Sequence, residues 1–332
     1  MRELSLVTAV EERLLLPAYA SRWPRASVVV HRSLALPLQL MGQLRRRTVL
    51  VEDEPLELVE IGREKLIRPF ASRWFGDLPT PIEETRGALW SPGALAEESG
   101  ADLVLAEVHR WMASRFRAAG WLIVPRSVRW RGDLAAIPPA PPSHGLRDNL
   151  RKVRKYGYTL RQARSPAEWE EFYSTMVAPQ ALARHGETAW IPSRRYIGAL
   201  ARIGILHLVM RGDEPVAGIC TVRQGDSLWL VLSGVRNGDP DLLRRGAGFA
   251  TLALSIGWAK AQGFRRLDAG RAGPFLSDGV QRLKRSWGLQ PEVDPLSHVV
   301  AVWVGSESAR RALAREPFLV ERRSGIEPFF GE

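Results

Sequence analysis

The sequence predicts an α/β protein of two domains, the second with a mixed, largely antiparallel sheet and one central crossover helix. Three observations lead to this fold class. At 332 residues the chain is too long for one small core. Four prolines within residues 137–145 exclude a helix interior or a central strand there. Residues 205–269 then alternate strand-like runs, tight turns and one long helical stretch.

The proline-rich stretch divides the chain into a first domain at 1–137, a linker at 138–145 and a second domain at 146–332. In the first domain we expect strands at 27–31, 48–51 and 121–124, and an amphipathic helix at 101–119. A helix end, a glycine and an aromatic residue occur in that order at 118–121 and again at 261–264. This weak repeat suggests that the two domains are related.

The second domain has clear turn signals between its predicted strands. Arg211-Gly212-Asp213 and Gln224-Gly225-Asp226 separate three strand-like runs, which predicts an antiparallel meander. In chain order we expect a strand at 158–163, helices at 166–183 and 192–203, strands at 205–210, 215–223 and 227–235, a helix at 239–262, a strand at 265–269, a helix at 278–287 and a strand at 298–304.

The long helix at 239–262 is predicted from its ends. Asp239 offers an N-cap, Pro240 suits the first helical position, and Gly263 suits the stop. Small residues recur along one stripe, at Gly246, Ala250, Ala253, Gly257 and Ala261. The stripe indicates either tight packing on the sheet or close approach of a cofactor.

The charge balance is basic, with 47 Lys and Arg against 36 Asp and Glu, a net charge of +11. Such a balance favours acidic partners such as nucleic acid, phosphorylated ligands or an anionic membrane surface, unless it reflects a general arginine bias. A strongly basic helix is expected at 146–157, whose cations are Arg147, Arg151, Lys152, Arg154 and Lys155. It is either a solvated face or a binding site for a phosphate-bearing ligand, such as a nucleotide or a tRNA backbone.

Several classes are excluded or disfavoured. Cys220 is the lone cysteine, so no disulfide can form within the chain; this favours a core thiol in the cytoplasm. No run approaches the roughly 20 apolar residues of a membrane span, and the start of the chain does not resemble a signal peptide. The histidines lack metal-ligand spacing, so no metal is expected.

The predicted order of elements resembles a GNAT acyltransferase domain, and one motif carries the likeness. Residues 245–250 read R-x-x-G-x-A, the spacing of the acyl-CoA pyrophosphate loop in that family. Backbone N–H groups at a helix N-terminus can hold a pyrophosphate when no side chain intrudes. The resemblance implies that Arg245, Gly246, Gly248 and Ala250 bind the donor. A helix starting at Asp239 would nevertheless place this motif inside the helix, where its N–H groups are used.

Further motifs resemble the Fem-like and exopolysaccharide-type GNAT acyltransferases. They are E-F-Y at 171–173 with Pro179, R-H-G at 184–186, D-A-G at 268–270, P-F-L-S-D-G at 274–279 and L-K-R-S-W-G at 283–288. Leu283 stands where an aromatic residue is usual. The likeness covers 146–288 and implies that the first domain is a divergent GNAT-like domain.

The resemblance also implies roles. Lys284 would support the transferred acyl group, Asp268 would take the amine proton or orient the acceptor, and His185 would be a base. Each also has a structural reading: a surface lysine, a loop-capping aspartate and a helix-end histidine. The residues expected to contact substrate are Tyr173, Arg151, Arg154, Lys155 and Arg271.

The sequence therefore predicts an N-acyltransferase that moves an acyl group from acyl-CoA, as co-substrate, to an amine acceptor. One alternative is a Fem-like transferase that uses aminoacyl-tRNA. Another is a non-catalytic module that binds nucleic acid or another protein. The sequence leaves open the acceptor, the acyl group and the oligomeric state.

Overall fold

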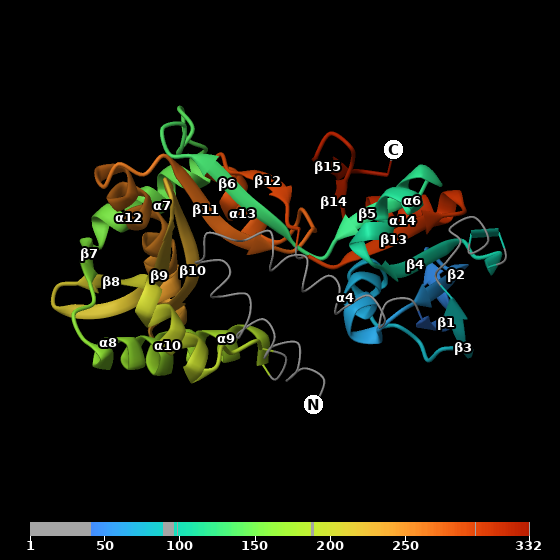
Figure 1. The fold of residues 1–332 in the computed structure, drawn as a ribbon, viewed down its shortest axis with the longest axis horizontal. Helices are drawn as coiled ribbons and strands as arrows, with labels where there is room; N and C mark the ends of the chain where they lie inside the picture. Colours follow the sequence, from blue (N-terminus) through green and yellow to red (C-terminus); the bar gives the residue numbers. More distant parts are fainter. Residues whose placement is uncertain (1–40, 89–95, 98, 187–188, 296, 332) are drawn as a thin grey trace. The chain divides into compact units, whose positions relative to one another are not determined.

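The computed structural model describes residues 41–88, 96–97, 99–186, 189–295 and 297–331. These form two compact units (Figure 1). The first unit holds the described residues up to Arg129, with Arg271–Arg282 and those from Pro291 on; the second holds Trp130–Gly270 and Leu283–Gln290. The strand expected at 27–31 lies outside the described residues.

The first unit contains a six-stranded sheet in the order β3-β1-β2-β4-β13-β5. Its strands are β1 (Met41–Val51), β2 (Glu54–Ile61), β3 (Glu83–Ala88), β4 (Leu103–Val108), β5 (Leu122–Pro125) and β13 (Val299–Val304). β2 and β4 pair in parallel, and the neighbouring pairs are antiparallel. A two-stranded sheet joins β14 (Phe318–Glu321) and β15 (Ile326–Phe329). The helices are α4 (Glu64–Phe75), η2 (Arg110–Met112), α6 (Ala113–Ala118) and α14 (Glu307–Ala314).

A second sheet has seven strands in the order β12-β6-β11-β10-β9-β8-β7, and most of their residues belong to the second unit. Its strands are β6 (Val128–Asp133), β7 (Tyr158–Gln162), β8 (Gly204–Arg211), β9 (Glu214–Gln224), β10 (Ser227–Val235), β11 (Arg266–Ala272) and β12 (Gln290–Val293). β7 to β10 pair antiparallel, whereas β10 and β11 are parallel. This confirms the mixed, largely antiparallel sheet and the meander.

The helical segments of this part of the chain follow the predicted order. They are α7 (His144–Lys155), α8 (Pro166–Glu171), the π-helical η3 (Phe172–Val177), α9 (Ala178–His185), α10 (Arg194–Ile203), η5 (Arg236–Gly238), α11 (Pro240–Arg244), α12 (Ala247–Ala261) and α13 (Gly279–Ser286). α8, η3 and α9 follow one another without a break where a single helix is predicted. Glycines let η3 lie against the sheet, since a Cβ at Gly234 would lie 2.5 Å from the carbonyl carbon of Met176.

Two strands lie in a different sheet from the one that the predicted domain boundary implies. β6 precedes the proline-rich stretch, yet it lies between β12 and β11 of the second sheet. β13 comes near the chain's end, yet it pairs with β4 and β5 of the first sheet. In Figure 1 the green β6 accordingly lies among orange strands, and the orange-red β13 among teal ones. The compact units are thus interleaved along the sequence, whereas the sequence predicts a boundary at 138–145.

The amphipathic helix predicted at 101–119 is wrong in its first half. Residues Leu103–Val108 form β4, all six of them buried, and only Ala113–Ala118 are α-helical. A short apolar run fits a buried strand as well as a helix, and here pairing on both sides of β4 decides in favour of the strand.

The repeat is present, but its register differs from the prediction. The series β2, α4, β4, α6, β5, β6 has the same order as β10, α12, β11, α13, β12, β13, with β3 added in the first. Gly120 therefore corresponds to Gly288, which follows α13, and not to Gly263. Both have left-handed backbones, with φ of 88° and 79°, as is usual after a helix.

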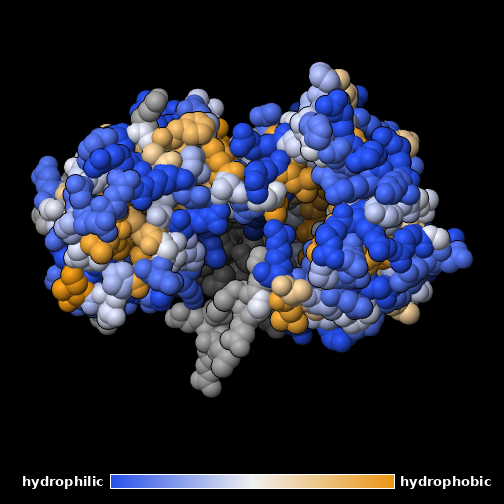
Figure 2. Space-filling view, turned by 180° about the vertical axis from the view of Figure 1, so that it is seen from behind, coloured by the Kyte–Doolittle hydropathy of each residue, from blue (hydrophilic) through white to orange (hydrophobic). Residues whose placement is uncertain are grey.

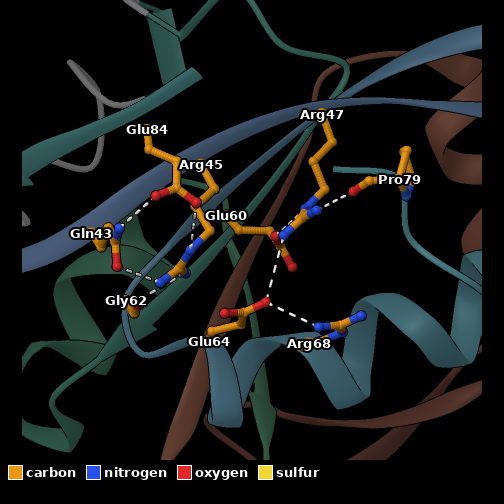
Figure 3. A network of polar contacts seen from close by, with 9 residues as sticks. All are labelled: Gln43, Arg45, Arg47, Glu60, Gly62, Glu64, Arg68, Pro79 and Glu84. Carbon is orange, nitrogen blue, oxygen red and sulfur yellow. Dashed lines mark hydrogen bonds and ion pairs between the residues drawn. The ribbon is translucent and has the colours of Figure 1, made fainter. Parts of the chain in front are cut away.

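A buried ionic network joins β1, β2 and α4 in the first unit (Figure 3). Arg47 on β1 donates from Nε to Glu60 on β2 at 2.8 Å, and both side chains are almost fully buried. Arg47 also donates to the Pro79 carbonyl and lies 3.7 Å from Glu64, at the start of α4. Because a buried charge is costly without its partner, the Arg47–Glu60 pair holds β1 to β2, and Glu64 adds a contact from α4.

The face of the molecule shown in Figure 2 is mostly hydrophilic, as the share of charged residues in the sequence indicates. Hydrophobic residues gather there in separate small patches. Among the helices that the structure describes, none is long and apolar enough to cross a membrane.

Candidate functional site

The long helix predicted at 239–262 is interrupted, and the interruption falls at the R-x-x-G-x-A motif. Asp239 caps α11 as expected, accepting a bond from the Asp241 N–H at 2.7 Å. The helix then stops at Arg245, and Gly246 takes a left-handed backbone with φ of 87°. α12 starts afresh at Ala247, and the Ala250 N–H donates back to the Gly246 carbonyl at 2.8 Å. The motif therefore lies at a helix start, not inside a helix.

This start presents backbone donors. The first N–H groups of an α-helix have no partner within that helix. In α12 these are the N–H groups of Ala247, Gly248 and Phe249, and the helix dipole adds a partial positive charge there. The geometry suits an anion such as a pyrophosphate.

The glycines differ in what surrounds them. A Cβ at Gly246 would lie 3.3 Å from Lys152 Cβ, and one at Gly248 would lie 3.3 Å from Leu243 and 3.4 Å from Val235. At Gly257, in contrast, no atom lies within 4 Å of such a Cβ, and the residue is exposed. Of the two interpretations of the small stripe, tight packing fits Gly246, although its neighbour is α7 and not the sheet, and it is wrong at Gly257; close approach of a cofactor stays a prediction.

The basic helix α7 lies against this helix start, as the Lys152 contact with Gly246 shows. The aromatic ring of Tyr156 lies near two cations: Lys155 Nζ is 5.5 Å from its centroid and Arg245 Cζ is 5.9 Å away. The two features that the sequence assigns to different donors, the motif and the basic helix, are thus neighbours.

Helical spacing divides the cations of α7 into two stripes. Arg147, Arg151 and Arg154 follow at intervals of four and three and form an exposed stripe that we call the arginine stripe. Lys152 and Tyr156 lie on another side, and Lys155 lies between them and Arg151, with its Nζ near the Tyr156 ring. We call Lys152, Lys155 and Tyr156 the lysine stripe. The contacts given above place the lysine stripe, not the arginine stripe, beside Gly246 and Arg245.

The parallel strands β10 and β11 pair over a short distance. Their ladder runs from Ser227↔Arg266 to Trp229↔Asp268, although β10 continues to Val235 and β11 to Ala272. β10 also has an irregularity between Leu230 and Leu232 in its pairing with β9. Such bulges redirect backbone groups and often lie beside active sites.

The corresponding strands of the first unit stay together. β2 and β4 pair up to Ile61↔Ala106, the last residue of β2. Beyond it, a Cβ at Gly62 would lie 2.6 Å from Glu107 Cβ, and Arg63 holds the buried Glu107 carboxylate. The ladder that ends early is therefore the one in the second unit.

Two predicted catalytic residues meet at Gly270, just after this ladder ends. Asp268 is 1% exposed; its Oδ1 accepts from the Gly270 N–H at 2.9 Å, and its Oδ2 accepts from Arg131 Nε at 2.9 Å. Lys284, on α13, is 6% exposed and donates from Nζ to the Gly270 carbonyl at 3.2 Å. A carboxylate at the N–H and a cation at the carbonyl are thus both bound to one residue, Gly270.

The remaining predicted residues lie elsewhere. Tyr173 is on η3, half-buried, with Arg194 Cζ 5.3 Å from its ring centroid. His185 is the last residue of α9, and its side chain lies outside the described part of the structure. Arg271 belongs to the first unit and pairs with the buried Asp294 at 2.5 Å. Among the described residues, no cluster of three or more His, Cys, Asp or Glu could hold a metal ion.

Sequence reasoning does not place three residues in this site: it names neither Tyr156 nor Arg131, and Lys152 is only one of the five cations of the basic helix. Lys152 and Tyr156 could have been found from the helical spacing of the basic segment, which separates them from the arginines. Arg131 gave no signal, because it is 137 positions from Asp268 and precedes the predicted linker.

Residues 143–285 match the family model of the acetyltransferase (GNAT) domain. This segment is therefore a GNAT domain, and it identifies the chain as an acyltransferase. No curated protein matches the sequence.

Three solved structures resemble the chain. L-PGS from Bacillus licheniformis has 14% identity and a TM-score of 0.41, over 79% of this chain and 85% of its own. FemX has 12% identity and a TM-score of 0.39, over 78% and 88%. A GCN5-related N-acetyltransferase from Sphaerobacter thermophilus has 18% identity and a TM-score of 0.36, over 60% and 57%. All three TM-scores are low, so these likenesses assign no function.

Proposed function

We propose that the chain is an N-acyltransferase that moves an acyl group from acyl-CoA to the amine of an acceptor. The observation that carries this proposal is the helix break at Gly246, which brings the R-x-x-G-x-A motif to the start of α12. The pyrophosphate of CoA would accept bonds from the N–H groups of Ala247 and Gly248, and Arg245 would add charge.

The reaction breaks one bond and forms another. The acceptor amine attacks the thioester carbonyl, a C–N bond forms, and the C–S bond breaks to release CoA as a thiol. The amine gives up a proton, and the carbonyl oxygen gains negative charge in the transition state. The thioester would lie along β10 beyond Trp229, where the ladder to β11 ends.

Residues of this chain then take separate roles. The buried Lys284 ammonium would stabilise the developing oxyanion, since preorganised cations act strongly in sites that exclude water. Asp268 would orient Gly270 rather than take a proton, because both of its oxygens already accept hydrogen bonds. His185 remains our candidate for the base, and Tyr173 for an acceptor contact.

Thiol release from acetyl-CoA, in the presence of a panel of amines, tests this proposal. We expect turnover by the parent protein and its loss in Lys284→Met, by about 10²–10³-fold if the lysine stabilises the oxyanion. Arg285→Met is the matched control, because Arg285 is the exposed neighbour on the same helix. Equal turnover by the parent and Lys284→Met would remove the lysine from the mechanism. No turnover and no CoA binding by the parent would remove the CoA proposal.

One observation favours the alternative donor, aminoacyl-tRNA. The arginine stripe of α7 is exposed and continues the basic surface beyond the lysine stripe. A CoA molecule held at Gly246 does not require that second stripe, whereas a nucleic-acid backbone would use both.

A further inference from the structure

Arg131 is a charged residue that the family match does not include, yet it contacts the candidate site. It lies on β6, ahead of the matched segment 143–285. Because β6 lies between β12 and β11 in the second sheet, Arg131 is on a strand that neighbours the one carrying Asp268. Its Nε donates to Asp268 Oδ2 at 2.9 Å, and its own side chain is 40% exposed.

The contact is the first of three that lead to the candidate catalytic lysine. Asp268 holds the Gly270 N–H with its other oxygen, and the Gly270 carbonyl accepts from Lys284 Nζ. Gly270 has a left-handed backbone with φ of 73°, and a Cβ there would lie 3.1 Å from the Leu230 carbonyl oxygen. This peptide is therefore confined beside β10, at the point where the β10–β11 ladder ends.

We propose that Arg131 is a positioning residue for acyl transfer, which rests on the function proposed above. A carboxylate as buried as that of Asp268 needs a cation partner. Arg131 supplies that partner and keeps the second oxygen directed at the Gly270 N–H. The Gly270 N–H belongs to the 269–270 peptide and the Gly270 carbonyl to the 270–271 peptide, and the two are joined at the Gly270 Cα. Holding the first peptide therefore limits where the carbonyl of the second can hold the Lys284 ammonium. The strand contributed from before the proline-rich stretch thereby completes the site.

Arg131→Gln, Arg131→Lys and the control Arg266→Gln test this role. Arg266 is an exposed arginine on β11. Two readouts need no catalysis: hydrogen exchange of the Gly270 amide, and the rate at which a small amine-reactive reagent labels Lys284, both followed by mass spectrometry. The third is steady-state kinetics with acetyl-CoA.

In Arg131→Gln we expect faster exchange at Gly270, a changed labelling rate at Lys284, and a kcat lower by about 10- to 100-fold with KM for acetyl-CoA nearly unchanged. Arg131→Lys should restore part of each, because an ammonium can also pair with Asp268. Arg266→Gln should match the parent protein.

Two results would overturn the proposal. One is unchanged exchange and labelling in Arg131→Gln, since Arg131 would then not hold the Gly270 peptide. The other is faster exchange throughout β8 and β9 as well, with kcat and KM both impaired, which marks a merely structural residue. If the parent protein transfers no acyl group, the proposed function fails, and the exchange and labelling results still decide whether Arg131 positions Lys284.

Discussion

Gly246 offers a sharp test of the helix start, because the chain supplies a matched control. Its φ of 87° costs about 1–2 kcal/mol for any residue with a Cβ, and a Cβ there would also lie 3.3 Å from Lys152. Gly257 lies in the middle of the same helix, is exposed, and has no atom within 4 Å of an added Cβ. Alanine at that position should stabilise the helix by about 0.5–1 kcal/mol.

The same substitution should therefore act with opposite signs. At about 2–4 °C per kcal/mol, Gly246→Ala and Gly257→Ala should differ in Tm by roughly 3–12 °C, with the parent between them. Circular dichroism melts measure this difference. Titration calorimetry should show CoA affinity lower by about tenfold in Gly246→Ala, because the donors of α12 shift, and unchanged in Gly257→Ala. If Gly246→Ala melts at or above the parent and binds CoA equally well, then a left-handed residue at 246 is not required for the start of α12 or for CoA binding.

Three further predictions concern stability and reactivity. Burial lowers the pKa of His207 to about 4, so the folded state keeps this side chain neutral. The free energy of unfolding, measured in urea melts, should therefore fall by up to about 3 kcal/mol as the pH drops from about 6.5 to 4. His207→Phe should weaken that dependence on pH. Glu60→Gln should cost about 3 kcal/mol in the same assay, because Arg47 would lose its buried charged partner and keep only the partly exposed Glu64, 3.7 Å away; a loss below about 1 kcal/mol would contradict this. Burial raises the pKa of Cys220, so a thiol reagent should label it only after unfolding, and rapid labelling of the native protein would refute this.

Local signals in the sequence predict much of the second unit. The turns at Gly212 and Gly225 have left-handed backbones, as their positions between strand-like runs indicate. Lys284 and Asp268, chosen by resemblance, do lie at a common residue, Gly270.

Features that depend on distant partners could not be predicted. The break at Gly246 falls between two segments that both fit a helix. A Cβ at this position would lie 3.3 Å from Lys152 on α7, a neighbour that the sequence does not reveal. Leu103–Val108 becomes a strand because β2 and β13 pair with it on either side. Likewise, the sequence gives no reason to associate Arg131 with Asp268.

Binding of CoA and of tRNA, each titrated across a range of salt concentrations, tests the donor most directly. The two stripes of α7 supply the variants: Lys152→Glu with Lys155→Glu beside the start of α12, and Arg147→Glu with Arg151→Glu on the other stripe. We predict that the parent binds CoA, that the lysine variant loses about tenfold or more in affinity, and that the arginine variant binds nearly as the parent does. Absence of CoA binding, with tRNA binding that falls steeply with salt and is lost in both variants, would contradict it and assign aminoacyl-tRNA as the donor.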